Sequence, residues 1–134
     1  MEYVTHPWLN DGTVERRAYQ DHIVATALGG NTLCVIPTGL GKTSIAALVA
    51  AERLRSDSEK KVLFMAPTKP LVEQHRTTFA RLFKIGEDEL QVVTGTTVQH
   101  VDAVGVVQVI VAFSAVQDVV AEAARQVVIA GAAI

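Results

Sequence analysis

A glycine-rich loop at residues 36–43 constrains the fold of this chain more than any other feature. The loop reads Ile-Pro-Thr-Gly-Leu-Gly-Lys-Thr, and it lies between the apolar run 32–36 and the alanine-rich helical pattern 44–55. A strand, a glycine loop and a helix in this order are the context that a phosphate-binding loop requires. Gly39 and Gly41 can adopt backbone angles that are closed to other residues, so the chain can approach an anion closely.

The loop residues would share the binding of a nucleotide. Backbone N–H groups of the loop and of the helix N-terminus would point at the β-phosphate, where the helix dipole favours negative charge. Lys42 would reach the β- and γ-phosphates, and the Thr43 hydroxyl would hold Mg²⁺. The alternative is a chance glycine turn, which leaves the lysine and the threonine in register unexplained. The predicted nucleotide-binding residues of the loop are Thr38, Gly39, Leu40, Gly41, Lys42 and Thr43.

Size and charge narrow the classes of protein. The length of 134 residues fits one domain, and 49% hydrophobic residues are enough for a core. The net charge of −2 provides no global basic field, so contact with nucleic acid would require a local surface. The single Cys34 is expected to be a buried packing residue without a disulfide partner. We see neither a secretory signal nor a membrane span, so a cytoplasmic protein is expected.

Helical and strand patterns alternate along residues 15–94. This alternation predicts an α/β fold with a mostly parallel sheet flanked by helices. Ligands of such sheets bind at the carboxyl ends of the strands. The expected helices are 15–28, 42–55 and 70–84, and the expected strands are 33–36, 61–66 and 90–94.

The composition changes after residue 97, and residues 98–134 are rich in valine and alanine. We expect a strand at 106–113, a helix at 114–126 and a strand at 127–130. The apolar end is typical either of an interrupted domain or of a core strand that packs in the ordinary way.

Two other groups of residues could contact ligands. Gln20, in the sequence Arg-Ala-Tyr-Gln, has a donor and an acceptor that can pair with the N6 and N7 edge of adenine, and its aromatic neighbour could pack on the ring. The alternative is an ordinary surface sequence.

The second group follows the strand expected at 61–66. There, the turn at 67–69 and the next helix N-terminus could contact a nucleic-acid backbone without reading sequence. The alternative is a plain turn capped by Thr68, with a solvated basic side on the helix. Residues 94–95 end the next strand in the same way. The predicted backbone-binding residues are Pro67, Thr68, Lys69, Thr94 and Gly95.

These blocks, in this order, resemble the first RecA-like domain of superfamily 2 helicases. In chain order, the blocks are Arg-Ala-Tyr-Gln, the glycine loop, Ala-Pro-Thr-Lys-Pro-Leu-Val-Glu-Gln-His at 66–75, and Thr94-Gly95. More narrowly, residues 6–97 are similar to archaeal Hef and Fanconi anaemia M-type DNA helicases, whose loops tolerate Ile36 in place of the first glycine. The resemblance implies a RecA-like P-loop domain, ATP and Mg²⁺ as cofactors, and ATP-driven remodelling of forked or branched DNA. It also implies that Gln20 reads adenine and that Lys69 lies on the DNA path.

The sequence also departs from the helicase pattern. Residues 111–115 lack the expected Thr-Pro-Gln, and no Asp-Glu-x-His block follows a strand. The only Asp-Glu pair, Asp88-Glu89, precedes the strand expected at 90–94. ATP hydrolysis requires a strand-end carboxylate on the Mg²⁺ shell and a group that orients the attacking water. The resemblance further implies a second RecA-like domain, which would supply arginine fingers and has no counterpart here.

We therefore expect residues 1–134 to be a piece of a first RecA-like helicase ATP-binding domain, truncated before the Asp-Glu-x-His block, with 98–134 as an atypical end. Such a piece would bind ATP but not hydrolyse it alone. A non-catalytic ATP- or DNA-binding module, complete as written, is the main alternative. A small-molecule kinase is a third possibility, and the block at 66–75 argues against it.

Overall fold

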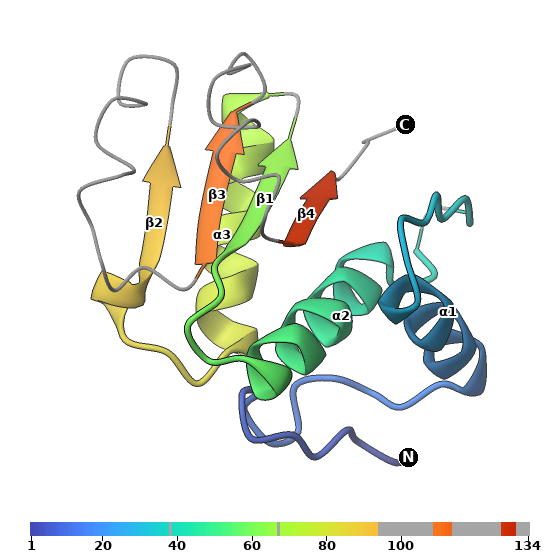
Figure 1. The fold of residues 1–134 in the computed structure, drawn as a ribbon. Helices are drawn as coiled ribbons and strands as arrows, with labels where there is room; N and C mark the ends of the chain where they lie inside the picture. The colour runs from blue at the N-terminus through green and yellow to red at the C-terminus, as the bar shows by residue number, and fades with distance from the viewer. Residues whose placement is uncertain (38, 67, 94–108, 114–126, 131–134) are drawn as a thin grey trace. The chain divides into compact units, whose positions relative to one another are not determined.

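The computed structural model describes residues 1–37, 39–66, 68–93, 109–113 and 127–130. It forms two compact units, Met1–Ser58 with Arg81–Lys84, and Glu59–Ala80 with Ile85–Ile134. No helix in these described ranges is long and apolar enough to cross a membrane. The elements in Figure 1 are α1 (Ala18–Leu28), α2 (Lys42–Ser56), β1 (Val62–Ala66), α3 (Lys69–Leu82), the 3₁₀ turn η1 (Glu87–Glu89), β2 (Leu90–Val93), β3 (Val109–Phe113) and β4 (Val127–Ala130).

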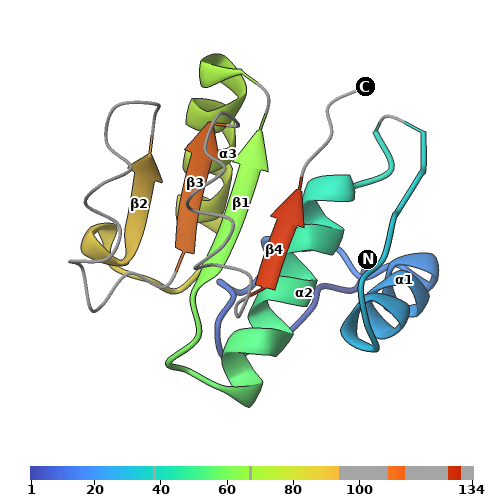
Figure 2. The ribbon, with the colours of Figure 1, turned by 45° about the horizontal axis from the view of Figure 1, so that its top comes forward.

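The second unit contains a parallel sheet with the strand order β2-β3-β1-β4 (Figure 2). Both edges of β1 are paired, since Val62 is in register with Val109 of β3 and with Val127 of β4. Val62, Leu63 and Phe64 are all buried, which explains why β1 is apolar without alternation. The prediction of an α/β fold with a parallel sheet is confirmed, because every described strand pair is parallel.

Helix α3 packs on this sheet through an aromatic cluster. The ring of Phe64 in β1 meets the rings of His75 and Phe79 edge-on, with centroids 4.6 and 4.8 Å apart. Both ribbon views show α3 alongside β1 and β3 (Figures 1 and 2). Burial of the His75 imidazole lowers its pKa, because the cation loses hydration there.

The first unit begins with an extended segment whose backbone pairs with residues distant in sequence. Tyr3 forms an antiparallel bridge with Glu15, and Arg16 N–H donates to the carbonyl of Glu2 at 2.8 Å. This pairing holds residues 15–17 in extended backbone, so α1 begins at Ala18. The predicted start of this helix at residue 15 is therefore wrong.

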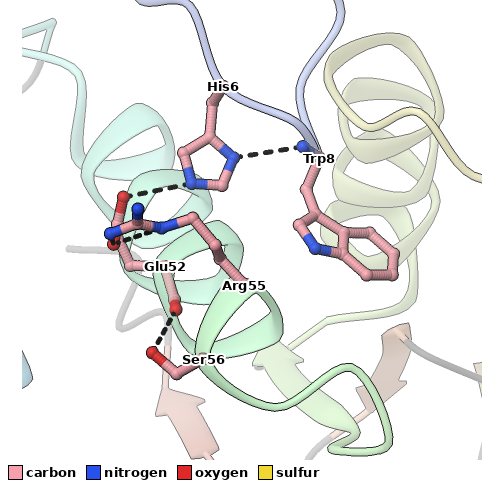
Figure 3. A network of polar contacts seen from close by, with 5 residues as sticks. All are labelled: His6, Trp8, Glu52, Arg55 and Ser56. Atoms are coloured by element: carbon pink, nitrogen blue, oxygen red, sulfur yellow. Dashed lines mark hydrogen bonds and ion pairs between the residues drawn. The ribbon is translucent and has the colours of Figure 1, made fainter.

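A polar network joins the N-terminal segment to α2 (Figure 3). His6 is 7% exposed, and its Nδ1 accepts a hydrogen bond from Trp8 N–H at 3.1 Å. A neutral His6 thus carries its proton on Nε2, which lies 3.0 Å from Glu52 Oε1. Arg55 donates to the other oxygen of Glu52 at 2.6 Å. The carboxylate is therefore shared between a buried imidazole and a guanidinium.

The strand predicted at 33–36 does not form, and that prediction is wrong. Residues 31–37 belong to no helix or strand, and the side chains of Leu33 and Val35 are 88% and 77% exposed. Cys34 is half-buried rather than buried. The physical reason is that an apolar run forms a strand only where another strand pairs with it, and no described strand pairs with residues 33–36.

The remaining expected elements agree with the structure where it describes them. The predictions for α2, β1, α3 and β2 are confirmed to within two residues at each end. The two strands expected after residue 97 are present as β3 and β4. The helix predicted at 114–126 lies outside the described residues.

Candidate phosphate-binding site

The glycine loop has the backbone conformation that the sequence predicts. Gly39 and Gly41 have φ angles of +88° and +80°, in the left-handed region that side chains disfavour. Gly41 is the N-cap of α2, and its carbonyl accepts the first helical hydrogen bond, from Ile45 N–H at 3.0 Å. The two glycines therefore turn the chain into the start of the helix. Thr38 lies outside the described residues.

The N-terminus of α2 presents donors that the described residues leave unused. None of the described side chains caps this end of the helix, and the N–H groups of the first turn have no intrahelical acceptor. Within the described part of the chain, the Lys42 ammonium and the Thr43 hydroxyl make no hydrogen bond or ion pair. Helix N–H groups, an ammonium and a hydroxyl together favour an anion, and the helix dipole adds to this preference.

Gln20 of α1 lies directly against this loop. Its side chain is 3% exposed, and Nε2 donates to the carbonyl of Leu40 at 3.3 Å. A Cβ added at Gly41 would lie 2.5 Å from Gln20 Nε2, so any other residue there would displace this carboxamide. The Oε1 atom of Gln20 is buried and has no hydrogen-bond partner in the described structure. The structure thus brings Gln20 and the loop together and leaves a buried acceptor beside them.

Tyr19 also contacts the loop, in a way that the sequence did not reveal. Its hydroxyl donates to the carbonyl of Leu40 at 2.7 Å. Arg17 donates to the Tyr19 oxygen at 3.3 Å and to Glu15 Oε2 at 3.1 Å. The hydrogen bond to Tyr19 and then the contact with Glu15 raise the pKa of Arg17. The sequence predicts that this aromatic ring packs on a base, and only its adjacency to Gln20 indicates a role near the loop.

The other predicted site residues belong to the second unit. Thr68 caps α3, since its Oγ1 accepts from Leu71 N–H at 3.4 Å. Lys69 is exposed at the first position of α3. Pro67, Thr94 and Gly95 lie outside the described residues. The capping role that we considered as the alternative is therefore present, and a contact with nucleic acid remains a prediction.

The acidic pair lies where the sequence predicts, before a strand rather than at its carboxyl end. Asp88 and Glu89 are in η1, immediately before β2. Glu89 Oε2 accepts a hydrogen bond from Gly86 N–H at 3.1 Å, which folds this side chain back on its own turn.

Comparison with known proteins decides the family of this chain. The profile of the DEAD/DEAH box helicase family matches residues 17–128. The chain belongs to the DEAD/DEAH box helicase family. The match includes α1, the glycine loop and α2, and extends through β1 and α3 to within two residues of the end of β4.

The chain is also similar to individual helicases over about two thirds of its own length. The chain is 46% identical over 93 residues to a putative ATP-dependent RNA helicase of Methanocaldococcus jannaschii. The aligned segment is 69% of this chain and 12% of that protein. It is 41% identical over 90 residues to the DEAD-box ATP-dependent DNA helicase Fancm of Drosophila melanogaster, or 67% of this chain and 6% of that protein. The chain thus spans about an eighth or less of these two relatives.

A solved structure gives the same picture for the fold. The Pyrococcus furiosus Hef helicase domain matches with a TM-score of 0.77 and 36% identity, over 92% of this chain and 28% of that one. The predicted resemblance to Hef and Fanconi anaemia M-type helicases is confirmed, and so is the RecA-like α/β fold class. This helicase chain corresponds to part of a larger enzyme in each comparison.

Proposed function

We propose that this chain binds ATP with Mg²⁺ through Gln20 and residues 38–43, as the nucleotide-binding part of a DNA helicase that acts on forked or branched DNA. One observation carries the proposal. The uncapped N-terminus of α2, with the unpaired Lys42 and Thr43 side chains, lies beside a buried Gln20 whose Oε1 has no partner among the described residues. Both features suit a nucleotide, one for its phosphates and the other for its base.

The donor set fits a triphosphate in its chemistry. Backbone N–H groups and the Lys42 ammonium would bind phosphate oxygens, and neither can bind a cation. Thr43 supplies one oxygen for Mg²⁺, which prefers oxygen ligands and keeps phosphate oxygens and water in its shell. A bound Mg²⁺ would supply positive charge that offsets the negative charge of the triphosphate. Thr43 is therefore proposed to hold Mg²⁺ only together with the nucleotide.

The Gln20 carboxamide can serve the loop and the base at once. One N–H of Nε2 is committed to the Leu40 carbonyl, which leaves the second N–H and both lone pairs of Oε1. Adenine offers an amino donor at N6 and an acceptor at N7, which match that remaining pair. We propose that Gln20 reads adenine in this way while it stays bonded to the loop.

Contact with DNA is proposed for Lys69 and the α3 N-terminus. Lys69 is exposed there, and an ammonium beside helix N–H groups is suited to phosphodiesters. One relative is named a DNA helicase and another a putative RNA helicase, so the choice of DNA needs its own test. Pro67, Thr68, Thr94 and Gly95 complete the proposed path.

We further propose that the isolated chain does not hydrolyse ATP. Asp88-Glu89 precedes β2, so this pair is not at the carboxyl end of a strand, where a Mg²⁺-shell carboxylate would be needed. Phosphate release by the full chain, measured with and without forked DNA, should stay at the background rate. Release that depends on Lys42 and rises with forked DNA would contradict this proposal.

A titration with matched lysine variants tests the nucleotide site. Calorimetry with Mg-ATP should show Lys42→Ala weakened by about ten- to a hundred-fold, since a hydrogen bond to a charged group contributes about 1.5–3 kcal/mol. Lys69→Ala, which removes an equally long cation in the other unit, should bind ATP like the wild type. Equal binding by Lys42→Ala and wild type would remove the nucleotide proposal.

The same pair of variants tests the nucleic-acid proposal in the opposite direction. Lys69→Ala should weaken binding to a forked DNA uniformly across sequences and reduce the salt slope by about one. Lys42→Ala should leave DNA affinity unchanged. Forked DNA, linear duplex and an RNA fork of the same sequence should be compared, and equal affinity for all three would contradict the preference for forked DNA.

A further inference from the structure

We propose that Tyr19 is a positioning residue of the phosphate loop, whose hydroxyl latches the peptide unit between Leu40 and Gly41 in the orientation that binds phosphate. This inference rests on the proposed nucleotide site. It assigns Tyr19 a role that acts through the backbone of the loop, and it requires no contact between Tyr19 and the nucleotide.

The latch is a chain of hydrogen bonds that ends on one carbonyl. Glu15 accepts from Arg17 at 3.1 Å, Arg17 donates to the Tyr19 oxygen at 3.3 Å, and Tyr19 donates to Leu40 at 2.7 Å. The last bond is the shortest, and a phenol that accepts from a guanidinium becomes a stronger donor. Gln20 Nε2 donates to the same carbonyl at 3.3 Å. The two lone pairs of this oxygen are thus both engaged.

The geometry of the peptide unit explains why this carbonyl matters. In a trans peptide, the C=O of Leu40 and the N–H of Gly41 point in opposite directions. A carbonyl held by Tyr19 and Gln20 therefore directs the N–H of Gly41, the N-cap residue of α2, away from these two side chains. If the peptide unit turned over, the carbonyl oxygen would replace that donor and repel an anion. Gly41 has no Cβ and a φ of +80°, so sterics alone do not prevent the flip.

The competing explanation is that Tyr19 supports adenine by packing, and a ligand without a base separates the two. Calorimetry on the full chain should compare Mg-ATP with Mg-tripolyphosphate for wild type and Tyr19→Phe. Loss of one hydrogen bond from the latch should weaken both ligands by the same factor, about three- to ten-fold. The control is Tyr3→Phe, which removes an exposed hydroxyl whose only hydrogen bond within the described structure goes to Met1 Sδ at 3.5 Å, and it should change the affinity for neither ligand.

The latch can also be measured without any ligand, which keeps it testable if binding changes for another reason. In the free protein, the amide resonance of Gly41 should shift and broaden in Tyr19→Phe, whereas the amides in the middle of α1 should not change. Circular dichroism should show the same helix content for Tyr19→Phe and Tyr3→Phe. A Tyr19→Phe variant that loses helix content is replaced by Arg17→Gln, which keeps the phenol and should weaken both ligands in the same ratio.

Each result decides between the inference and the function on which it rests. Wild-type affinity of Tyr19→Phe for both ligands, or loss of ATP binding alone, would overturn the latch and leave the nucleotide site intact. Unchanged ATP binding by Lys42→Ala would overturn the proposed function instead. An unchanged Gly41 resonance in Tyr19→Phe would also overturn the latch, whatever the nucleotide results.

Discussion

Replacing Gly41 by alanine should damage the fold in two separable ways. A side chain at a φ of +80° strains the backbone by about 1–2 kcal/mol. The new Cβ would also lie 2.5 Å from Gln20 Nε2, so the buried carboxamide must move and lose its bond to Leu40. A lost hydrogen bond adds about 0.5–1.5 kcal/mol. The free energy of unfolding should therefore fall by about 1.5–3.5 kcal/mol, the sum of the two terms.

Two other glycines isolate these terms. Gly39→Ala has the strained φ of +88° but meets nothing within 4 Å, so only the backbone strain should remain. Gly30→Ala has neither feature, and it should be neutral or stabilising by up to about 1 kcal/mol.

Urea unfolding provides the measurement, detected by far-ultraviolet circular dichroism and by tryptophan fluorescence. Trp8 is the single tryptophan of the chain, and it lies in the same unit as the three glycines. Gly41→Ala should have the lowest midpoint at unchanged slope, Gly39→Ala an intermediate one, and Gly30→Ala the highest. Equal losses for Gly41→Ala and Gly39→Ala would refute the close contact with Gln20. A Gly41→Ala protein as stable as Gly30→Ala would refute the whole loop geometry.

Two further predictions concern ionisable groups outside the loop. Burial lowers the pKa of His75 below its ordinary 6.5, so the unfolded chain binds the proton more readily than the folded chain, and stability should fall as the pH drops through 6.5. His75→Phe keeps a ring against Phe64 and should remove this loss of stability. Thermal melts of both proteins at pH 5 and 7.5 provide the measurement. Glu52→Gln should destabilise the first unit by about 1–2 kcal/mol, because it weakens a charge-assisted bond to the buried His6. Glu2→Gln, which removes an exposed ion pair with Arg16 at 3.4 Å, should change the free energy of unfolding by less than about 0.5 kcal/mol in urea. Equal losses for the two variants would contradict a stabilising contact between Glu52 and His6.

The parts of the site that could be predicted are those encoded locally. Two glycines before a lysine set the turn and the start of α2 through their own backbone freedom, so the spacing was sufficient. The family resemblance implies that Gln20 reads adenine, which stays a prediction. Its bond to the Leu40 carbonyl could not be predicted, because nothing in a single glutamine specifies a neighbour 20 residues away. The parallel sheet followed from helix and strand patterns that alternate along the chain, and the unbroken apolar run of β1 indicated burial on both faces.

The errors arose where distant partners decide the outcome. The run at 33–36 has the composition of a strand, but composition does not choose a partner, and Leu33 and Val35 are exposed. The start of α1 was misplaced because Arg16 N–H bonds to Glu2, which no helical pattern can show. The Tyr19 hydroxyl was missed because one residue carries both a ring and a donor, and only the fold selects between them.

Amide chemical-shift mapping of the full chain with Mg-ATP tests the central claim most directly. The largest changes should fall on the backbone amides of residues 39–43 and on the side-chain amide of Gln20, and Lys42→Ala should require about ten- to a hundred-fold more Mg-ATP to produce them. Changes that are absent, or that centre on residues outside the loop and α1, would contradict the assignment of this loop as the nucleotide site.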